Sequence, residues 1–93
     1  MQVPENKYVA DFLEQAHKSS SCHKHEIMSG NLCGCFYCQQ TFLPLDILDW
    51  IEEDFGKGET AICPKCGIDS VLSSNYPIAD HKFLEEMNRR WFQ

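Results

Sequence analysis

Two stretches, one near each end of the chain, repeat apolar residues with the period of an α-helix. In residues 5–18 the repeating positions are Tyr8, Val9, Phe12, Leu13 and Ala16. In residues 79–92 they are Phe83, Leu84, Met87 and Trp91. Because an α-helix turns once in about 3.6 residues, each set forms one apolar stripe opposite a polar face. The pattern predicts an N-terminal helix at about 5–18 and a closing helix at about 79–92.

Two further helices are predicted inside the chain. A short one at about 22–29 follows the serines at 19–21, whose hydroxyl oxygens can cap a helix. A longer one starts at Pro44, because proline suits the first turn of a helix. Its apolar positions recur with the helical period and are Leu45, Ile47, Leu48, Trp50 and Ile51. Since most of the intervening residues are acidic, we expect a helix at 44–54 with a negatively charged face.

Short apolar runs around the cysteines are typical of strands. Residues 32–43 suit two short strands on either side of a turn. Residues 59–62 lead as a strand into Cys63, and residues 68–72 lead out of the next turn as another. Helices at both ends and short strands between them predict a small α+β fold.

Length and composition predict one folded domain. The chain has 93 residues, which is enough for a single small core, so residues 1–93 form one predicted unit. An apolar fraction of 43% and a charged fraction of 24% are typical of a folded chain. No apolar run approaches the ~18–20 residues that cross a membrane, and the N-terminus has no secretion-signal pattern. We therefore expect a soluble cytoplasmic protein.

Acidic residues outnumber basic ones, 14 against 8, and give a net charge of −6. Nucleic-acid binding draws on Lys and Arg, which displace counterions from phosphates, so this charge disfavours it. A basic protein partner fits the charge better. The candidate partner-binding residues lie on the predicted acidic helix and are Asp46, Asp49, Glu53 and Asp54.

Six cysteines carry the strongest chemical signal, and four of them form two Cys-x-x-Cys pairs. The pairs are Cys35/Cys38 and Cys63/Cys66, with 24 residues between them. Two residues between thiolates let a tight turn direct both sulfurs to one ion, and two such turns complete a tetrahedral site. The spacing predicts one structural Zn²⁺ per chain, with disulfides or an iron centre as alternatives. The predicted fold is a small zinc ribbon, with knuckles at 33–38 and 63–67, wrapped by three or four helices.

A second group of potential ligands consists of Cys22, His23, His25 and Cys33. One interpretation is a second metal site. Neighbouring residues of a short helix point to different faces, however, which favours small buried cysteines and hydrogen-bonded or surface histidines. Cys33 is also an alternative ligand to Cys35, although Cys35 has the better spacing from Cys38.

An enzyme, such as a metal-dependent hydrolase or nuclease, is one alternative function. Cys22 or Cys33 with His23 would supply a nucleophile and a base, and so would Ser70 with Asp69 and His81. Adjacent strand residues point to opposite faces, which weakens the second set. The chain has no nucleophile elbow, phosphate loop or paired-carboxylate pattern. A catalytic role is therefore the weaker interpretation, and no catalytic residue is assigned.

A nucleic-acid-binding zinc ribbon is the other alternative. It would require the scattered basic residues to converge on one face. Those residues are Lys18, Lys24, Lys65, Lys82, Arg89 and Arg90.

Several segments together resemble one family of small bacterial proteins. They are Cys33-Gly-Cys35-Phe-Tyr-Cys38, Phe42-x-Pro44-x-x-Ile47-x-x-Trp50, Thr60-Ala61-x-Cys63-Pro-x-Cys66-Gly-Ile-Asp-Ser-Val71, Tyr76-Pro-Ile78 and Phe83-Leu84-x-x-Met87-x-x-x-Trp91-Phe92. The chain is similar, over about residues 16–92, to uncharacterised family members labelled only as cytoplasmic proteins. The resemblance implies a bacterial, cytoplasmic, zinc-ribbon-like domain with Cys35, Cys38, Cys63 and Cys66 as ligands. It implies no activity.

These features together predict a small zinc-binding protein that acts as a protein-interaction or regulatory module. An adaptor fits this description, and so does an immunity-like protein that masks a toxin or another basic partner. Exposed aromatic side chains and the predicted acidic helix would supply the contacts.

Overall fold

Three α-helices, one 3-10 helix and five strands make up the part of the chain that the computed structural model describes, residues 7–53 and 58–93. In chain order they are α1 (Ala10–Lys18), α2 (Lys24–Met28), β1 (Cys33–Cys35), β2 (Thr41–Phe42), the 3-10 helix η1 (Pro44–Asp46), β3 (Trp50–Glu53), β4 (Gly58–Ala61), β5 (Val71–Ser73) and α3 (His81–Phe92). The fold is a small α+β fold, as the sequence predicts.

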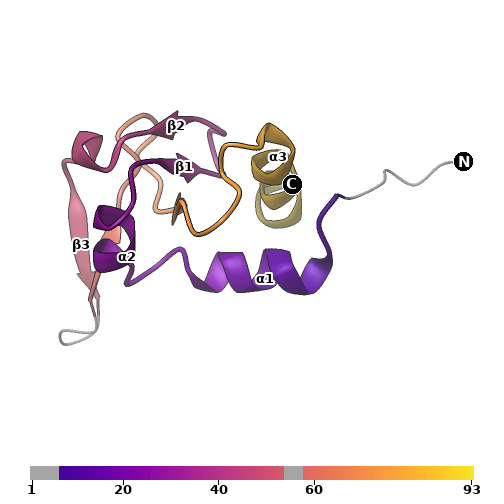
Figure 1. The fold of residues 1–93 in the computed structure, drawn as a ribbon, viewed down its shortest axis with the longest axis horizontal. Coiled ribbons are helices and arrows are strands. Elements are labelled where there is room, and N and C mark those ends of the chain that lie inside the picture. The colour runs from indigo at the N-terminus through magenta and orange to yellow at the C-terminus, as the bar shows by residue number, and fades with distance from the viewer. Residues whose placement is uncertain (1–6, 54–57) are drawn as a thin grey trace, which may run out of the picture.

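The strands form two antiparallel sheets. The first has the order β2-β1-β5, with Cys33 opposite Phe42 on one side and Ser73 on the other. The second pairs β3 with β4, from Trp50 opposite Ala61 to Glu53 opposite Gly58. β3 and α2 stand at one end of the molecule and α3 at the other, with β1 and β2 between them (Figure 1). The β1–β2 connection can thereby meet the loop between β4 and β5.

The apolar stripes of α1 and α3 face each other in the core. Leu13 and Ala16 of α1 are buried, and so are Phe83, Leu84 and Met87 of α3. Burial of apolar surface is what holds these short helices in place, because helices of this length are marginal alone in water. The two amphipathic helices are therefore confirmed.

Helix boundaries are shorter than the sequence pattern suggests. α1 begins at Ala10 rather than near residue 5, and residues 5 and 6 lie outside the described ranges. α2 covers only residues 24–28. α3 begins at His81 because the Asp80 side chain accepts the amide hydrogen of Lys82 at 3.0 Å and caps the helix.

The helix predicted at 44–54 is wrong. Pro44–Asp46 forms one 3-10 turn, and Trp50–Glu53 is strand β3. The residues that suggested an apolar helical face, Leu45 and Leu48, are 79% and 84% exposed, whereas Pro44 and Ile47 are buried. The ladder to β4 satisfies the backbone groups of this segment better than an isolated helix could, since no apolar face of that helix would be covered.

The described residues contain no helix of the length and hydropathy required to cross a membrane.

Candidate metal centre

Four sulfur atoms, from Cys35, Cys38, Cys63 and Cys66, lie within 4.8 Å of one another. The Sγ atoms of Cys35 and Cys66 are 3.6 Å apart, and those of Cys38 and Cys63 are 3.7 Å apart. A disulfide would bring two sulfurs to about 2.05 Å. Tetrahedral bonds of about 2.3 Å would place them about 3.8 Å apart. The arrangement thus fits a four-coordinate metal ion and not a pair of disulfides.

The two knuckles have matching backbone conformations. In each, the amide after the second cysteine returns to the carbonyl of the first: Gln39 N to Cys35 O at 2.8 Å, and Gly67 N to Cys63 O at 3.0 Å. Both returning residues are in the left-handed region, with φ of 61° at Gln39 and 80° at Gly67. A left-handed residue reverses the chain sharply, which directs both sulfurs of a knuckle to one side.

Hydrogen bonds from the backbone favour a thiolate at Cys63. Burial raises the pKa of this thiol, but amide hydrogens of Lys65 and Cys66, with the neighbouring thiols, outweigh it and bring the pKa below the ordinary value. The Lys65 amide nitrogen is 3.3 Å from Cys63 Sγ. We therefore expect Cys63 to lose its proton before the other three thiols of the cluster.

The other thiols resist losing theirs. Burial, followed by the charge and hydrogen bonds of the neighbouring thiols, raises the pKa of Cys38 to about 11. Burial likewise raises the pKa of Cys66, and Cys35 adds to the effect. Sulfurs this close repel one another when ionised, and a divalent cation between them removes that repulsion. Binding of a metal ion at this cluster would therefore release protons.

Asn88 of α3 supports the first knuckle and was missed by sequence reasoning. Its Nδ2 donates to the carbonyls of Phe36 and Tyr37 at 3.1 and 2.9 Å. Both carbonyls lie inside the turn between Cys35 and Cys38, so the helix holds that turn in place. No spacing pattern marks an asparagine for this role, because the contact crosses 51 residues of sequence.

The proposed second metal site is not assembled. His23 uses both ring nitrogens on backbone groups, with Nδ1 2.9 Å from Ser19 O and Nε2 3.1 Å from Ala61 N. Cys33 is buried, and its Sγ lies 3.4 Å from Phe42 O, while Cys22 and His25 are exposed. Among the residues that the structure describes, the four-cysteine cluster is the one group of three or more such side chains close enough to share an ion.

Two members of an alternative catalytic set, Ser70 and Asp69, line one pocket. Ser70 Oγ lies 3.2 Å from Cys35 Sγ. The imidazole that lines this pocket belongs to His17, not to His81, which begins α3.

Four of the six basic residues considered for nucleic-acid binding pair with carboxylates. Lys24 pairs with Glu59 at 3.1 Å, and Arg90 pairs with Glu14 at 2.7 Å. Lys82 and Arg89 both pair with Glu85, at 3.1 and 3.0 Å.

The acidic residues predicted on a helix lie instead on η1, the following loop and β3. The Asp46 carboxylate accepts the amide hydrogen of Leu43 at 3.0 Å. Asp49 is exposed in the loop, and Glu53 is partly buried at the end of β3. Asp54 lies outside the described residues.

Comparison of the chain with protein-family models, with curated proteins and with solved structures finds no match.

Proposed function

We propose that this chain is a small protein-binding module whose fold is held by one structural zinc ion. The four-cysteine cluster carries the proposal, because its sulfur spacing fits tetrahedral Zn²⁺. Cys35, Cys38, Cys63 and Cys66 would be the ligands, and the two knuckles with β1, β2 and β5 would form the zinc ribbon. Thiolate-rich sites of this kind favour zinc in a reducing compartment.

The chemistry of the ligand set supports a structural rather than a catalytic ion. Four thiolates fill all positions of a tetrahedral centre, so none is left for a reactive water. The ion would supply a cross-link between residues 35–38 and 63–66. Structural zinc contributes on the order of 10–16 kcal/mol in small finger peptides, which is large beside the stability of a small core.

An exposed apolar surface supports the binding role. The leucine surface, as we call it, consists of Met28, Leu43 and Leu45, which line one hollow, and of Leu48, three residues further along the chain; all four are exposed. Met28 and the Leu43–Leu45 segment line a hollow of about 360 Å³ between α2 and η1. Exposed apolar groups gathered in this way mark interaction sites in many proteins.

Acidic residues beside the leucine surface suggest the chemistry of the partner. Asp46 and Asp49 are exposed and alternate along the chain with Leu45 and Leu48. A partner with apolar side chains flanked by Lys or Arg would bury the leucines and neutralise these carboxylates. An adaptor fits, and so does an immunity-like protein that masks a basic partner.

Native mass spectrometry with elemental analysis tests the zinc site. The protein should be purified under reducing conditions without added metal. We expect one zinc per chain, and its loss on substitution Cys66→Ser but not on Cys22→Ser, since Cys22 is exposed and away from the cluster. Two zinc ions would call for a further ligand set, and a folded chain without metal would overturn the proposal.

A matched pair of variants tests the leucine surface. Leu45→Ser with Leu48→Ser removes its two most exposed side chains, and Val9→Ser removes an apolar side chain that is 71% exposed at the start of α1. We expect the wild type and Val9→Ser to bind the same purified, basic partner, first isolated by cross-linking, and the leucine variant to lose it. Equal binding by all three would remove the leucine surface from the proposal.

A further inference from the structure

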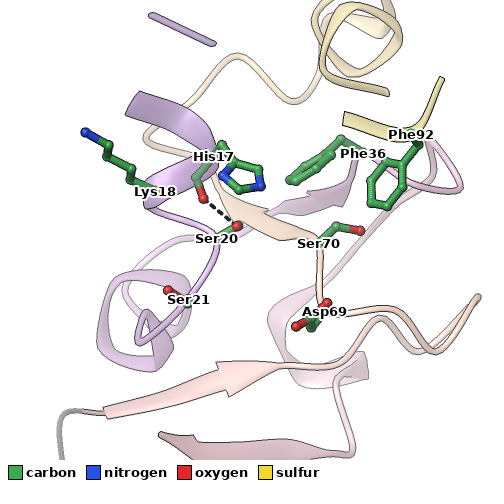
Figure 2. A pocket seen from close by; sticks show the side chains of 8 residues that line it. All are labelled: His17, Lys18, Ser20, Ser21, Phe36, Asp69, Ser70 and Phe92. Atoms are coloured by element: carbon green, nitrogen blue, oxygen red, sulfur yellow. Dashed lines mark hydrogen bonds between the residues drawn. The ribbon is translucent and has the colours of Figure 1, made fainter. Parts of the chain in front are cut away.

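A separate pocket lies where the end of α1 meets residues 69–70 and the last turn of α3 (Figure 2). Its volume is about 450 Å³, within the range of about 300–1,000 Å³ that small-molecule sites occupy. We call it the Asp69 pocket. The residues on which the inference rests are His17, Ser20, Phe36, Asp69, Ser70 and Phe92.

Aromatic rings form one end of this pocket. Figure 2 shows the rings of His17, Phe36 and Phe92 in a row, with Asp69 at the opposite end. The Phe36 and Phe92 ring centres are 5.7 Å apart, and the His17 ring stacks on Trp91 at 4.4 Å, with an angle of 7° between the planes. These contacts hold the rings in place. Phe36 is buried behind them, and the exposed rings of Phe92 and His17 offer a surface on which a flat group can stack.

Two hydroxyl groups of the pocket, those of Ser20 and Ser70, have lone pairs that can accept hydrogen bonds. Ser20 Oγ already donates its hydrogen to His17 O at 2.6 Å, so its lone pairs remain. Ser70 Oγ is 3.2 Å from Cys35 Sγ, and a metal-bound thiolate has no hydrogen, so Ser70 must be the donor there. The assignment of Ser70 Oγ as a free acceptor rests on the proposed zinc site. The assignment of Ser20 Oγ does not.

Asp69 adds a negative charge. Within residues 7–53 and 58–93, its carboxylate makes no hydrogen bond or ion pair. Lys18 is also among the lining residues, but Figure 2 shows its amino group directed away from Asp69 and from the rings. A flat ligand that supplies hydrogen-bond donors and positive charge therefore matches Asp69, the two hydroxyl groups and the rings.

We propose that the Asp69 pocket binds a guanidinium group. A guanidinium is planar, carries five N–H donors and no acceptor, pairs with carboxylates and stacks on aromatic rings. The group would pair with Asp69, donate to Ser20 and Ser70, and lie against the aromatic end. The same chemistry occurs next to the pocket, where the Arg90 guanidinium carbon lies 5.2 Å from the Trp91 ring centre. The net charge of −6 also favours a cation.

The guanidinium can belong to a free small molecule or to an arginine side chain of another protein. Two probes separate these sources. Free L-arginine carries its own carboxylate and ammonium, whereas a capped Gly-Gly-Arg-Gly-Gly peptide presents the side chain as a protein would. Tighter binding of the peptide identifies a protein source, and tighter binding of free arginine identifies a small molecule. Either result supports the guanidinium site.

Titration of the zinc-loaded protein with Nα-acetyl-L-arginine methylamide tests the proposal, with amide NMR shifts as the measurement. We expect shifts at residues around the pocket. Asp69→Asn should weaken binding about tenfold or more, because a hydrogen bond to a charged group is lost. The matched control Asp49→Asn removes the same charge from an exposed position elsewhere and should change affinity by less than about twofold.

Three results would overturn the guanidinium site. One is no shift at ~20 mM probe, far above the millimolar range of weak binding. Another is equal weakening by both substitutions. A third is equal or tighter binding of the lysine analogue or of adenosine, which would show that a planar cation is not what the pocket selects. Zinc content is measured in each sample. If the probe does not bind but zinc is retained, only the guanidinium proposal is overturned. A folded wild type without zinc overturns the zinc proposal instead.

Discussion

His23 Nε2 accepts the amide hydrogen of Ala61 at 3.1 Å. The other ring nitrogen, Nδ1, is 2.9 Å from the carbonyl oxygen of Ser19, so Nδ1 carries the proton and donates it. His23 is 4% exposed, and its ring joins the segment before α2 to strand β4. Only the neutral imidazole satisfies both contacts, because a proton on Nε2 would face the amide hydrogen of Ala61.

Acid should destabilise the fold through His23. Burial lowers the pKa of His23 below its ordinary value of 6.5, against the opposing effects of the Ser19 carbonyl and Glu26. The unfolded chain then binds a proton more readily than the folded chain. The stabilisation is fully present above about pH 6.5 and is lost as the pH falls below it toward the folded pKa.

Imidazole NMR titration and urea unfolding measure this effect. We expect the His23 resonances to stay those of the neutral ring when the pH falls below 6.5. His23→Gln should be less stable than wild type near neutral pH and should lose less of its stability on mild acidification. His25→Gln, at an exposed position, is the control and should follow the wild type. A His23 that titrates at or above 6.5 would contradict the prediction.

Cys33→Ala should lower stability without loss of metal. Cys33 is fully buried, and burial raises the pKa of its thiol to about 12, so it stays protonated and donates toward Phe42 O. Removing a small buried group and a weak hydrogen bond costs about 1–2 kcal/mol. Chemical unfolding and zinc analysis of the same sample check both parts. A variant that no longer binds zinc would make Cys33 a ligand.

Asn88→Ala should weaken the metal centre without touching a ligand. The substitution leaves the carbonyls of Phe36 and Tyr37 without their donor. Loss of these two hydrogen bonds at a buried position costs about 2–3 kcal/mol. Competition with a chelator should show faster zinc release. The control is Arg90→Ala, which removes an exposed ion pair with Glu14 and the contact with the Trp91 ring and should cost about 1 kcal/mol, with no change in zinc release.

Acidification should release the metal, because the affinity of the cluster for the ion should fall as the pH falls. The thiols of Cys38 and Cys66 hold their protons more tightly than a free cysteine does, because burial and neighbouring thiols raise their pKa. Each must lose a proton to bind the ion, so apparent affinity increases with pH. A competitive zinc indicator at several pH values measures the slope. An affinity independent of pH would mean that the ion is not bound by these thiols.

Gly67→Ala and Gly34→Ala should both destabilise the fold, for different reasons. At Gly67 an added Cβ meets nothing within 4 Å, so the cost is that of a left-handed φ of 80°, about 1–2 kcal/mol. At Gly34 the added Cβ would lie 3.1 Å from Ile78 Cβ, inside the core. Gly67→Asn should therefore recover much of the loss at its site, because asparagine adopts this φ more readily. Thermal unfolding of the three variants measures these losses, and Gly67→Asn should be more stable than Gly67→Ala.

Local patterns in the sequence were enough to identify the four cysteines that cluster in the structure. The spacing within Cys35-x-x-Cys38 and within Cys63-x-x-Cys66 is a property of one turn, and each turn closes with hydrogen bonds between residues close in sequence. The apolar stripes of α1 and α3 were visible for the same reason, since residues three or four apart share one face of a helix.

The same periodicity misled the prediction for residues 44–54. Leu45, Leu48 and Ile51 have helical spacing, but they face outward, and Trp50–Glu53 pairs with β4 instead. Periodicity identifies which residues would share a face, but it does not say whether any part of the molecule covers that face. The strand partner decided the outcome.

By itself, the sequence determined the small α+β class, the two terminal amphipathic helices and the four clustered cysteines, because each depends on contacts or spacings within a few residues. Only the tertiary structure decided the strand at Trp50–Glu53, the neutral form of His23, the support of the first knuckle by Asn88, and the Asp69 pocket. These features join groups far apart along the chain, such as His23 with Ala61, at a separation of 38 residues. Such contacts form only after the core has brought distant segments together, and no local pattern records them.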